Sequence, residues 1–282
     1  MTFPASRNFL SDGLVFPESP RWHDGELWFS DLLSGRLMKA GMDGKLTEIA
    51  STDGWLSGIG WLPNGDLIAV AMATQRLLRL DGRRFVDVCD LSGVTTMHPN
   101  DMVVDSKGRA YIGEVGYDLH GGEAFKGANL VMVAPGADPV VVADGLACPN
   151  GMVITADGKT LIVAESLGDC FAAFDIRDDG TLTNRRAWAL TPGLGPDGIC
   201  LDAEGAIWAG CPFSGNVIRI REGGEITHQF QTEKLPLACM LGGPERKSLF
   251  LCRADHPDEA QKTGSGGCID IFEVDVAGTG LP

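Results

Sequence analysis

The sequence repeats one unit six times, and this repeat limits the fold more than any other feature. The unit is clearest at residues 147–164, where two short apolar strands flank an Asp157-Gly158 turn. Val, Ile and Leu favour strands, and Asp-Gly is a preferred turn in tight β-hairpins. A hairpin repeated along the chain predicts a repetitive all-β protein.

The spacing of the copies predicts the architecture. Their starts lie 39 to 50 residues apart, and most copies continue into a third apolar strand and often a fourth. Four short strands at such a period are typical of a propeller blade. The sequence therefore predicts an all-β, six-bladed β-propeller that occupies residues 1–282 as one domain. The last copy is one strand short, so we expect residues 8–16 to supply its outer strand and close the ring.

The charge balance limits the partners. There are 38 acidic and 23 basic side chains, for a formal net charge of −15. Phosphate backbones and anionic lipid repel such a chain, so we expect neither a nucleic-acid nor a membrane partner. The first residues lack the basic and apolar regions of a secretory signal, and the eight cysteines contain no Cys-x-x-Cys pair. These features predict a cytoplasmic protein with reduced thiols.

In a propeller the first strand of each blade lines the central channel, so its starting residues converge on one axis. The six residues at this position are Glu18, Ser57, Asn100, Asn150, Asp197 and Leu237. Two carboxylates and two amides form an oxygen-rich cup that suits a hard divalent cation. The alternative is that the Asn-Gly and Asp-Gly pairs are ordinary turn formers. Glu18 favours the cation, because Glu is a poor turn former and precedes Ser-Pro here.

Four motifs carry these residues: Phe16–Trp22, Pro99–Asp101, Cys148–Gly151 and Pro196–Gly198. In this order and spacing they resemble the family of regucalcin (senescence marker protein), gluconolactonase and luciferin-regenerating enzyme, over essentially the whole chain. The resemblance implies a six-bladed propeller with one divalent cation in the channel, and lactone hydrolysis as the typical reaction. It makes Glu18, Asn150 and Asp197 the metal ligands. It also makes Asp197 the general base and Asn100 a substrate contact.

Together with this cup, the resemblance implies a metal-dependent lactonase acting on a small molecule. A cation there polarises the lactone carbonyl and lowers the pKa of a water, whose proton a nearby carboxylate accepts. Calcium is the expected ion, with zinc, magnesium, manganese and iron as alternatives. No Gly-x-Ser-x-Gly elbow supports a serine hydrolase. Two alternatives remain: a phosphotriesterase or metal-enolate isomerase or hydratase on the same scaffold, and a non-catalytic propeller that binds calcium or a protein.

The chain departs from the family pattern where substrate is bound. Sugar-lactone members typically carry Arg at the position of His98, and His lacks the forked donors that hold sugar hydroxyls. We therefore expect a lactone less polar than a sugar lactone. His98 is either a proton carrier or a hydrogen-bonded rim residue. Glu114 and Asp118 lie where the family often places an acidic substrate contact, and the alternative is a solvated loop charge.

Five apolar side chains lie near the predicted channel mouths. They are candidates for a pocket wall, with core packing as the alternative role: Trp55, Met72, Met97, Phe213 and Met240.

Overall fold

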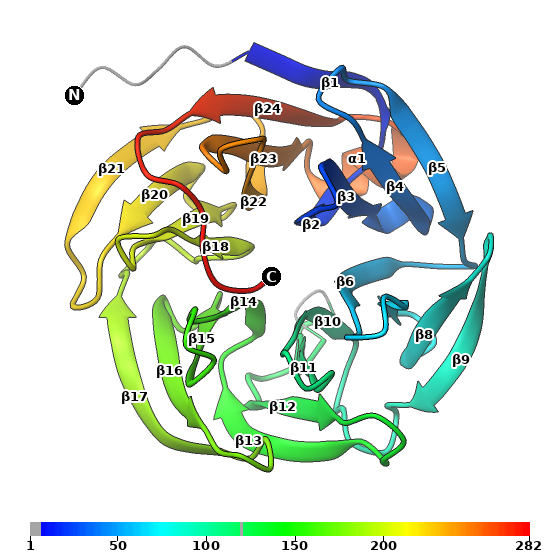
Figure 1. Ribbon diagram of the computed structural model, residues 1–282, viewed down its shortest axis with the longest axis vertical. Helices are drawn as coiled ribbons and strands as arrows, with labels where there is room; N and C mark the ends of the chain where they lie inside the picture. The colour runs from blue at the N-terminus through cyan, green and yellow to red at the C-terminus, as the bar shows by residue number, and fades with distance from the viewer. Residues whose placement is uncertain (1–6, 119–120) are drawn as a thin grey trace.

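The computed structural model describes residues 7–118 and 121–282. Its strands form six four-stranded antiparallel sheets, arranged as blades in a ring (Figure 1). The prediction of an all-β, six-bladed propeller is confirmed. We call the face at which the innermost strands begin the site face, and the opposite one the far face.

Blades one to three follow the chain from the innermost strand outward. Blade one contains β2 (Pro17–His23), β3 (Glu26–Asp31), β4 (Arg36–Ala40) and β5 (Leu46–Ser51). Blade two contains β6 (Leu56–Trp61), β7 (Leu67–Ala71), β8 (Arg76–Asp81) and β9 (Arg84–Asp90). Blade three contains β10 (Pro99–Val104), β11 (Ala110–Glu114), β12 (Ala128–Val133) and β13 (Val140–Leu146).

Blades four to six continue the same order. Blade four contains β14 (Pro149–Ile154), β15 (Thr160–Glu165), β16 (Cys170–Ile176) and β17 (Leu182–Leu190). Blade five contains β18 (Ile199–Leu201), β19 (Ile207–Cys211), β20 (Asn216–Ile220) and β21 (Ile226–Gln231). Blade six contains β22 (Leu235–Gly242), β23 (Ser248–Ala254), β24 (Gly267–Glu273) and β1 (Arg7–Leu14).

The place of a strand in its blade follows from its residues. β7 and β11 are buried along their whole length and are continuous runs of apolar and small residues, apart from the closing glutamate of β11. The outermost strands β9 and β13 are exposed over much of their length, and β9 carries Arg84, Asp87 and Asp90. An inner strand packs against neighbouring blades on both faces, so both of its faces must be apolar.

The N-terminal strand closes the ring, as predicted. β1 pairs antiparallel with β24, from Arg7 opposite Ile271 to Leu14 opposite Gly267, and the two strands lie side by side at the rim (Figure 1). The pairing covers the edge of β24 that would otherwise be open to another chain.

Aromatic packing strengthens this closure. Trp22 of β2 stacks on Phe250 of β23 with 5.6 Å between ring centroids, and Phe9 of β1 meets the same ring edge-on at 5.1 Å. Burying one large apolar side chain stabilises a fold by about 1.5–3 kcal/mol, and an aromatic pair adds about 0.5–1.5 kcal/mol. The first and last blades are thus joined by core packing as well as by strand pairing.

Residues 277–281 cross the far face toward the centre of the ring (Figure 1). The main chain of Thr279 donates to the carbonyl of Leu201, and Leu281 exchanges two hydrogen bonds with Ile154. These partners are the last residues of β18 and β14, so the segment covers the far ends of the innermost strands.

Helices are short in this fold. η1 (Leu32–Ser34) lies between β3 and β4. The insertion between β23 and β24 contains α1 (Pro257–Thr263), a short helix that the sequence did not predict. Over residues 7–118 and 121–282, no helix has both the length and the apolar character needed to cross a membrane.

Candidate functional site

Five of the six innermost strands place a proline directly before the residue predicted to face the axis. These pairs are Pro17-Glu18, Pro99-Asn100, Pro149-Asn150, Pro196-Asp197 and Pro236-Leu237. Proline has no N–H for the sheet, so it suits the beginning of a strand. In five blades the pairing with the second strand becomes irregular just past this point, for example between Glu18 and Arg21. β-Bulges of this kind bend the strand and redirect its side chains, and they are common next to functional sites.

Asn150-Gly151 and Asp197-Gly198 do not close turns in the structure, because the N–H groups of Gly151 and Gly198 donate to carbonyl oxygens of the next blade, those of Asp197 and Leu237. A Cβ on Gly151 would lie 2.5 Å from the carbonyl oxygen of Asp197, and one on Gly198 would lie 2.2 Å from the Cβ of Ala238. The glycines are required because neighbouring innermost strands approach this closely. The alternative that these two pairs are turn formers is therefore wrong.

In three blades a buried carboxylate at the end of the second strand holds the segment that enters the first strand. These carboxylates are Asp31, Glu114 and Glu165, which pair across the sheet with Pro17, Pro99 and Pro149. They accept hydrogen bonds from the backbone N–H groups of Val15, Phe16, Thr96, Met97 and Ala147, at 2.6 to 3.0 Å. The bonds fix the main chain just before Glu18, Asn100 and Asn150. We call these three residues the entry carboxylates.

Glu114 is fully buried, and its two oxygens accept N–H groups of Thr96, Met97 and Asn129. Its carboxylate is therefore turned to the main chain. The structure gives Glu114 a supporting place under the segment that carries His98, and does not leave it open as a substrate contact.

Glu18 and Asp197 are buried carboxylates on blades one and five. Burial raises the pKa of Glu18 to about 8, and the charge of Asp101 also raises it, against the Ser19 N–H that donates to it at 3.0 Å. Burial, followed by the charges of Glu18 and Asp101, raises the pKa of Asp197. Oδ1 of Asp197 is buried and has no hydrogen-bond partner among the described residues. A buried oxygen without a donor is costly, and a cation would satisfy it.

Further along β2, Arg21 forms a buried ion pair with Asp101 of β10, with Nη2 at 2.7 Å from Oδ1. The guanidinium also donates to the carbonyl oxygens of Ile59 and Met102. One cation thus joins blades one, two and three, and its charge lowers the pKa of Glu18, opposing the effect of burial. Breaking a buried pair by removing one partner costs about 3–5 kcal/mol. Arg21 therefore supports both the ring and the charge balance of the site.

The two predicted amides are held in opposite orientations. Ser57 donates its hydroxyl to Oδ1 of Asn100 at 3.0 Å, which leaves the Asn100 Nδ2 to donate elsewhere. Asn150 donates from Nδ2 to the hydroxyl of Ser166 at 3.3 Å, which leaves its Oδ1 to accept or ligate. Asn150 therefore offers an oxygen, whereas Asn100 offers a hydrogen-bond donor.

His98 is half-buried on the segment leading to β10. Its Nδ1 lies 3.1 Å from the carbonyl oxygen of Met72, and the ring of Trp55 meets it edge-on with 5.4 Å between centroids. A ring nitrogen that faces a carbonyl carries the proton, so this contact assigns Nε2 as the acceptor of the neutral ring. Asp118 is exposed in the loop after β11, where its Oδ1 accepts the Gly121 N–H at 2.6 Å. It organises its own loop.

The five apolar candidates for a pocket wall divide into two groups. Met240 and Met72 are buried in core clusters, and Trp55 packs against the cluster that contains Met72. Phe213 is 66% exposed and follows β19 at the site face. Met97 is half-buried, and its main-chain carbonyl accepts a hydrogen bond from Gln75. Core packing thus accounts for Met240 and Met72.

The donor set fits a hard cation. Cys148 lies next to Pro149, but burial, with the charges of Asp197 and Glu114, raises its pKa to about 12, so its thiol stays protonated and is a poor ligand. Within the part of the chain that the structure describes, no group of three or more His, Cys, Asp or Glu side chains could hold a metal ion. A site formed by Glu18 and Asp197 would therefore take any third protein ligand from another residue type, and Asn150 is the candidate that the sequence analysis named.

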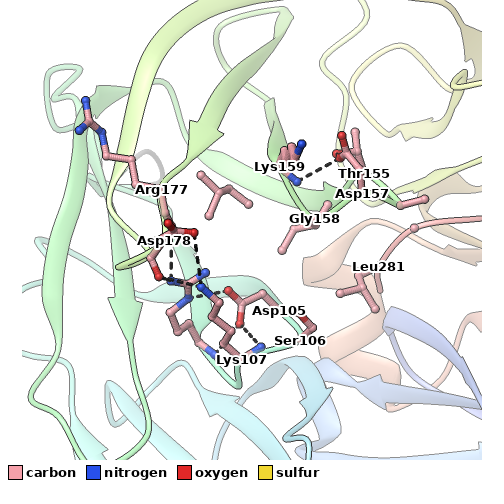
Figure 2. Close-up of a pocket in the computed structure, with 15 residues that line it drawn as sticks. Asp105, Ser106, Lys107, Thr155, Asp157, Gly158, Lys159, Arg177, Asp178 and Leu281 are labelled. Atoms are coloured by element: carbon pink, nitrogen blue, oxygen red, sulfur yellow. Dashed lines mark hydrogen bonds and ion pairs between the residues drawn. The ribbon is translucent and has the colours of Figure 1, made fainter.

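A separate cavity of about 550 Å³ opens on the far face. Figure 2 shows Asp105 and Asp178 on one side of it. Arg109 joins them, since its Nε donates to Oδ2 of Asp105 at 2.6 Å and its Nη1 donates to the carbonyl oxygen of Asp178 at 2.9 Å. Ile154 lines this cavity at the end of β14, whereas Asn150 lies near the beginning of that strand. The cavity is therefore not part of the candidate site.

The protein is thus a six-bladed β-propeller whose innermost strands begin with a recurring set of polar residues. Residues 16–255 match the family model described as the SMP-30/Gluconolactonase/LRE-like region, and the chain belongs to this family. The resemblance inferred from the four motifs is thereby confirmed.

Relatives match over nearly the whole chain. Regucalcin of Xenopus laevis is 29% identical over 95% of this chain and 94% of that protein. Pentonolactonase XacC of Haloferax volcanii is 27% identical over 94% of this chain and 92% of that protein. The crystal structure of the calcium-binding protein regucalcin from Agrobacterium tumefaciens superposes with a TM-score of 0.80, at 18% identity, over 99% of this chain and 97% of that one. The family thus includes lactonases.

Sequence reasoning missed three supports of the site: Asp31, Glu165 and Ser166. A signal existed for the two acids, because Asp31, Glu114 and Glu165 follow Glu18, Asn100 and Asn150 by 13, 14 and 15 residues. No spacing within one repeat points to Ser166. Its role depends on a hydrogen bond to Pro196 in the next blade, which only the folded ring brings close.

Proposed function

We propose that this chain is a divalent-metal-dependent lactonase with its site at the start of the innermost strands. Membership of a family that includes lactonases supports the reaction class. The observation that carries the proposal is Oδ1 of Asp197, a buried carboxylate oxygen with no hydrogen-bond donor among the described residues, whose pKa the charge of Glu18 raises. A cation bound between two buried carboxylates stabilises the ionised form of both.

Glu18, Asn150 and Asp197 would hold the cation. When bound, it supplies Lewis-acid polarisation of the lactone carbonyl and makes the attacking water more acidic. Oxygen ligands favour calcium, and magnesium, manganese, zinc and iron are the alternatives. One structural relative is described as a calcium-binding protein, which agrees with this choice.

The protein side chains then divide the remaining work. The carboxylate of Asp197 accepts a proton from the water that attacks the carbonyl carbon. The C–O bond of the ring breaks, and the proton held by Asp197 goes to the ring oxygen, which leaves as an alcohol. Nδ2 of Asn100, left free by the Ser57 hydrogen bond, donates to the carbonyl oxygen as negative charge develops on it.

The substrate is a small-molecule lactone less polar than a sugar lactone. Nδ1 of His98 is bound to the Met72 carbonyl, which leaves one ring nitrogen for a substrate, so His98 cannot form a forked pair of donors. Among the described residues, the three most exposed large hydrophobic side chains are Leu190 at 67%, Phe213 at 66% and Phe125 at 59%. Phe213 follows β19 and Phe125 lies in the loop between β11 and β12, so both belong to site-face loops, and exposed apolar groups there suit a substrate with an apolar substituent.

Elemental analysis of the purified chain, paired with turnover assays before and after chelation, tests the proposal. The panel contains sugar lactones, alkyl-substituted lactones and a phosphotriester. We expect a stoichiometric divalent cation and lactone hydrolysis that chelation abolishes and calcium restores. Turnover of the phosphotriester alone, or of no substrate in a cation-loaded chain, would contradict it.

A further inference from the structure

Ser166 follows β15, is 4% exposed and bonds both to one proposed ligand and to the residue that precedes another. Its hydroxyl lies 3.3 Å from Nδ2 of Asn150 in its own blade and 2.8 Å from the carbonyl oxygen of Pro196 in the next blade. We propose that Ser166 is a positioning residue that turns the amide oxygen of Asn150 toward the cation. The inference rests on the proposed function and extends it to a residue outside the ligand set.

The orientation follows from the number of protons on the hydroxyl. A serine hydroxyl has one proton to donate. The carbonyl oxygen of Pro196 can only accept, so Ser166 must donate this proton to Pro196. Toward Asn150 the hydroxyl can only accept, and the amide must present Nδ2 to it. Oδ1 of Asn150 then points away from Ser166 and remains without a competing donor from this side chain. A flipped amide would set two oxygen acceptors against each other.

The same hydroxyl also holds the main chain of the second ligand. Pro196 directly precedes Asp197, and the Gly151 N–H donates to the Asp197 carbonyl oxygen at 3.1 Å. Ser166 and Gly151 thus tie blade four to blade five on either side of the peptide of Asp197. The proposed site has only two carboxylate ligands, so the Asn150 oxygen is needed as a third. The orientation of this amide therefore sets the affinity for the cation.

The test is calorimetric titration of calcium into the chelator-treated full chain, with magnesium, manganese and zinc titrated in parallel. Removing a group that orients a metal ligand typically costs 10- to 100-fold in affinity. We expect Ser166→Ala to weaken binding of the preferred ion by at least tenfold. Ser248→Ala is the control, because it removes a buried serine hydroxyl that donates to Glu273 within blade six at the far face, and we expect it to change this affinity less than threefold. Thermal unfolding verifies that each variant folds, and Ser166→Cys replaces Ser166→Ala if the alanine variant does not.

A second background separates orientation from general loosening. The two oxygens of a carboxylate are equivalent, so Asn150→Asp needs no orienting partner. In that background we expect Ser166→Ala to change the affinity less than threefold. An equal loss in both backgrounds, or no loss with Asn150 present, would overturn the role of Ser166 while leaving the proposed function intact. Failure of the wild-type chain to bind any of the four ions would overturn both.

Discussion

The charge of Glu18 raises the pKa of Asp197, although Glu18 lies at the start of blade one and Asp197 lies at the start of blade five. Both side chains are buried, and the charge of Asp101 adds to the cost of ionising either one. Closing six repeats into a ring is what places two such distant acids within electrostatic reach of each other. Several measurable properties follow from this relationship.

Removing either carboxylate should separate activity from folding. We expect Glu18→Gln and Asp197→Asn each to lower lactone turnover by at least 100-fold and to abolish calcium binding, because each takes away a charged ligand. Calorimetry and turnover assays measure both effects. The exposed Glu222→Gln is the control and should behave as wild type. Unfolding of both site variants would instead indicate that the ion serves the structure.

The chelator-treated protein should lose stability as the pH rises. Glu18 has a pKa of about 8 in the folded chain, above its ordinary value of 4.5, so between these pH values the folded chain retains a proton that the unfolded chain has released. The free energy of unfolding then falls with pH, by up to about 1.4 kcal/mol per pH unit for one group. Below pH 4.5 the stabilisation is fully present.

Denaturant unfolding of the chelated chain between pH 5 and pH 8 measures this slope. We expect Glu18→Gln to flatten it, because glutamine carries no proton to lose, and to be more stable than the chelated wild type at pH 8. A wild-type stability that rises over this range would contradict the buried, uncompensated state of the two acids.

The entry carboxylates should contribute to stability and to substrate binding. Glu114→Gln replaces one acceptor oxygen by an NH₂ group that faces backbone N–H donors, at a cost of about 1–3 kcal/mol in the free energy of unfolding. The segment that carries His98 and Asn100 would loosen, so we expect KM to rise more than kcat falls. Chemical denaturation measures the free energy of unfolding, and steady-state kinetics measure KM. If both equal the wild-type values, Glu114 does not support this segment.

His98→Arg should shift the substrate preference. The guanidinium supplies forked donors for hydroxyl groups, whereas His98 has one nitrogen occupied by the Met72 carbonyl. We expect the ratio of kcat/KM for a hydroxylated lactone to that for an alkyl lactone to rise about tenfold, the equivalent of about 1.4 kcal/mol. Unchanged ratios across the panel would rule out His98 as a determinant of specificity.

The architecture was predictable from the sequence because each repeat carries its own strand and turn signals. The closing strand, residues 8–16, followed from the strand missing in the last copy, and the pairing of Asn8 with Asp270 and of Leu10 with Ile269 confirms it. What periodicity could not show is why glycine follows Asn150 and Asp197. Local turn chemistry accounts for such pairs equally well, and only the approach of a neighbouring strand decides between the two.

The placement of the candidate residues at the starts of the innermost strands also followed from the repeat, but their environment did not. The sequence placed Glu114 near substrate by its offset alone, whereas its burial and its three backbone partners depend on how two loops pack. The orientation of Asn150 depends on Ser166, which bonds across to another blade. Contacts between blades do not appear as a repeat in the sequence. The sequence therefore points to the candidate site residues but not to the residues that orient them.

The segment 277–281, which lies across the far ends of β14 and β18, has a kinetic consequence. With that side covered by main chain and Arg21 spanning blades one to three, we expect the proposed lactone to enter, and the hydrolysed acid to leave, through the site face. The acid must then leave before the next lactone binds, so inhibition by the accumulated acid should be competitive with the lactone.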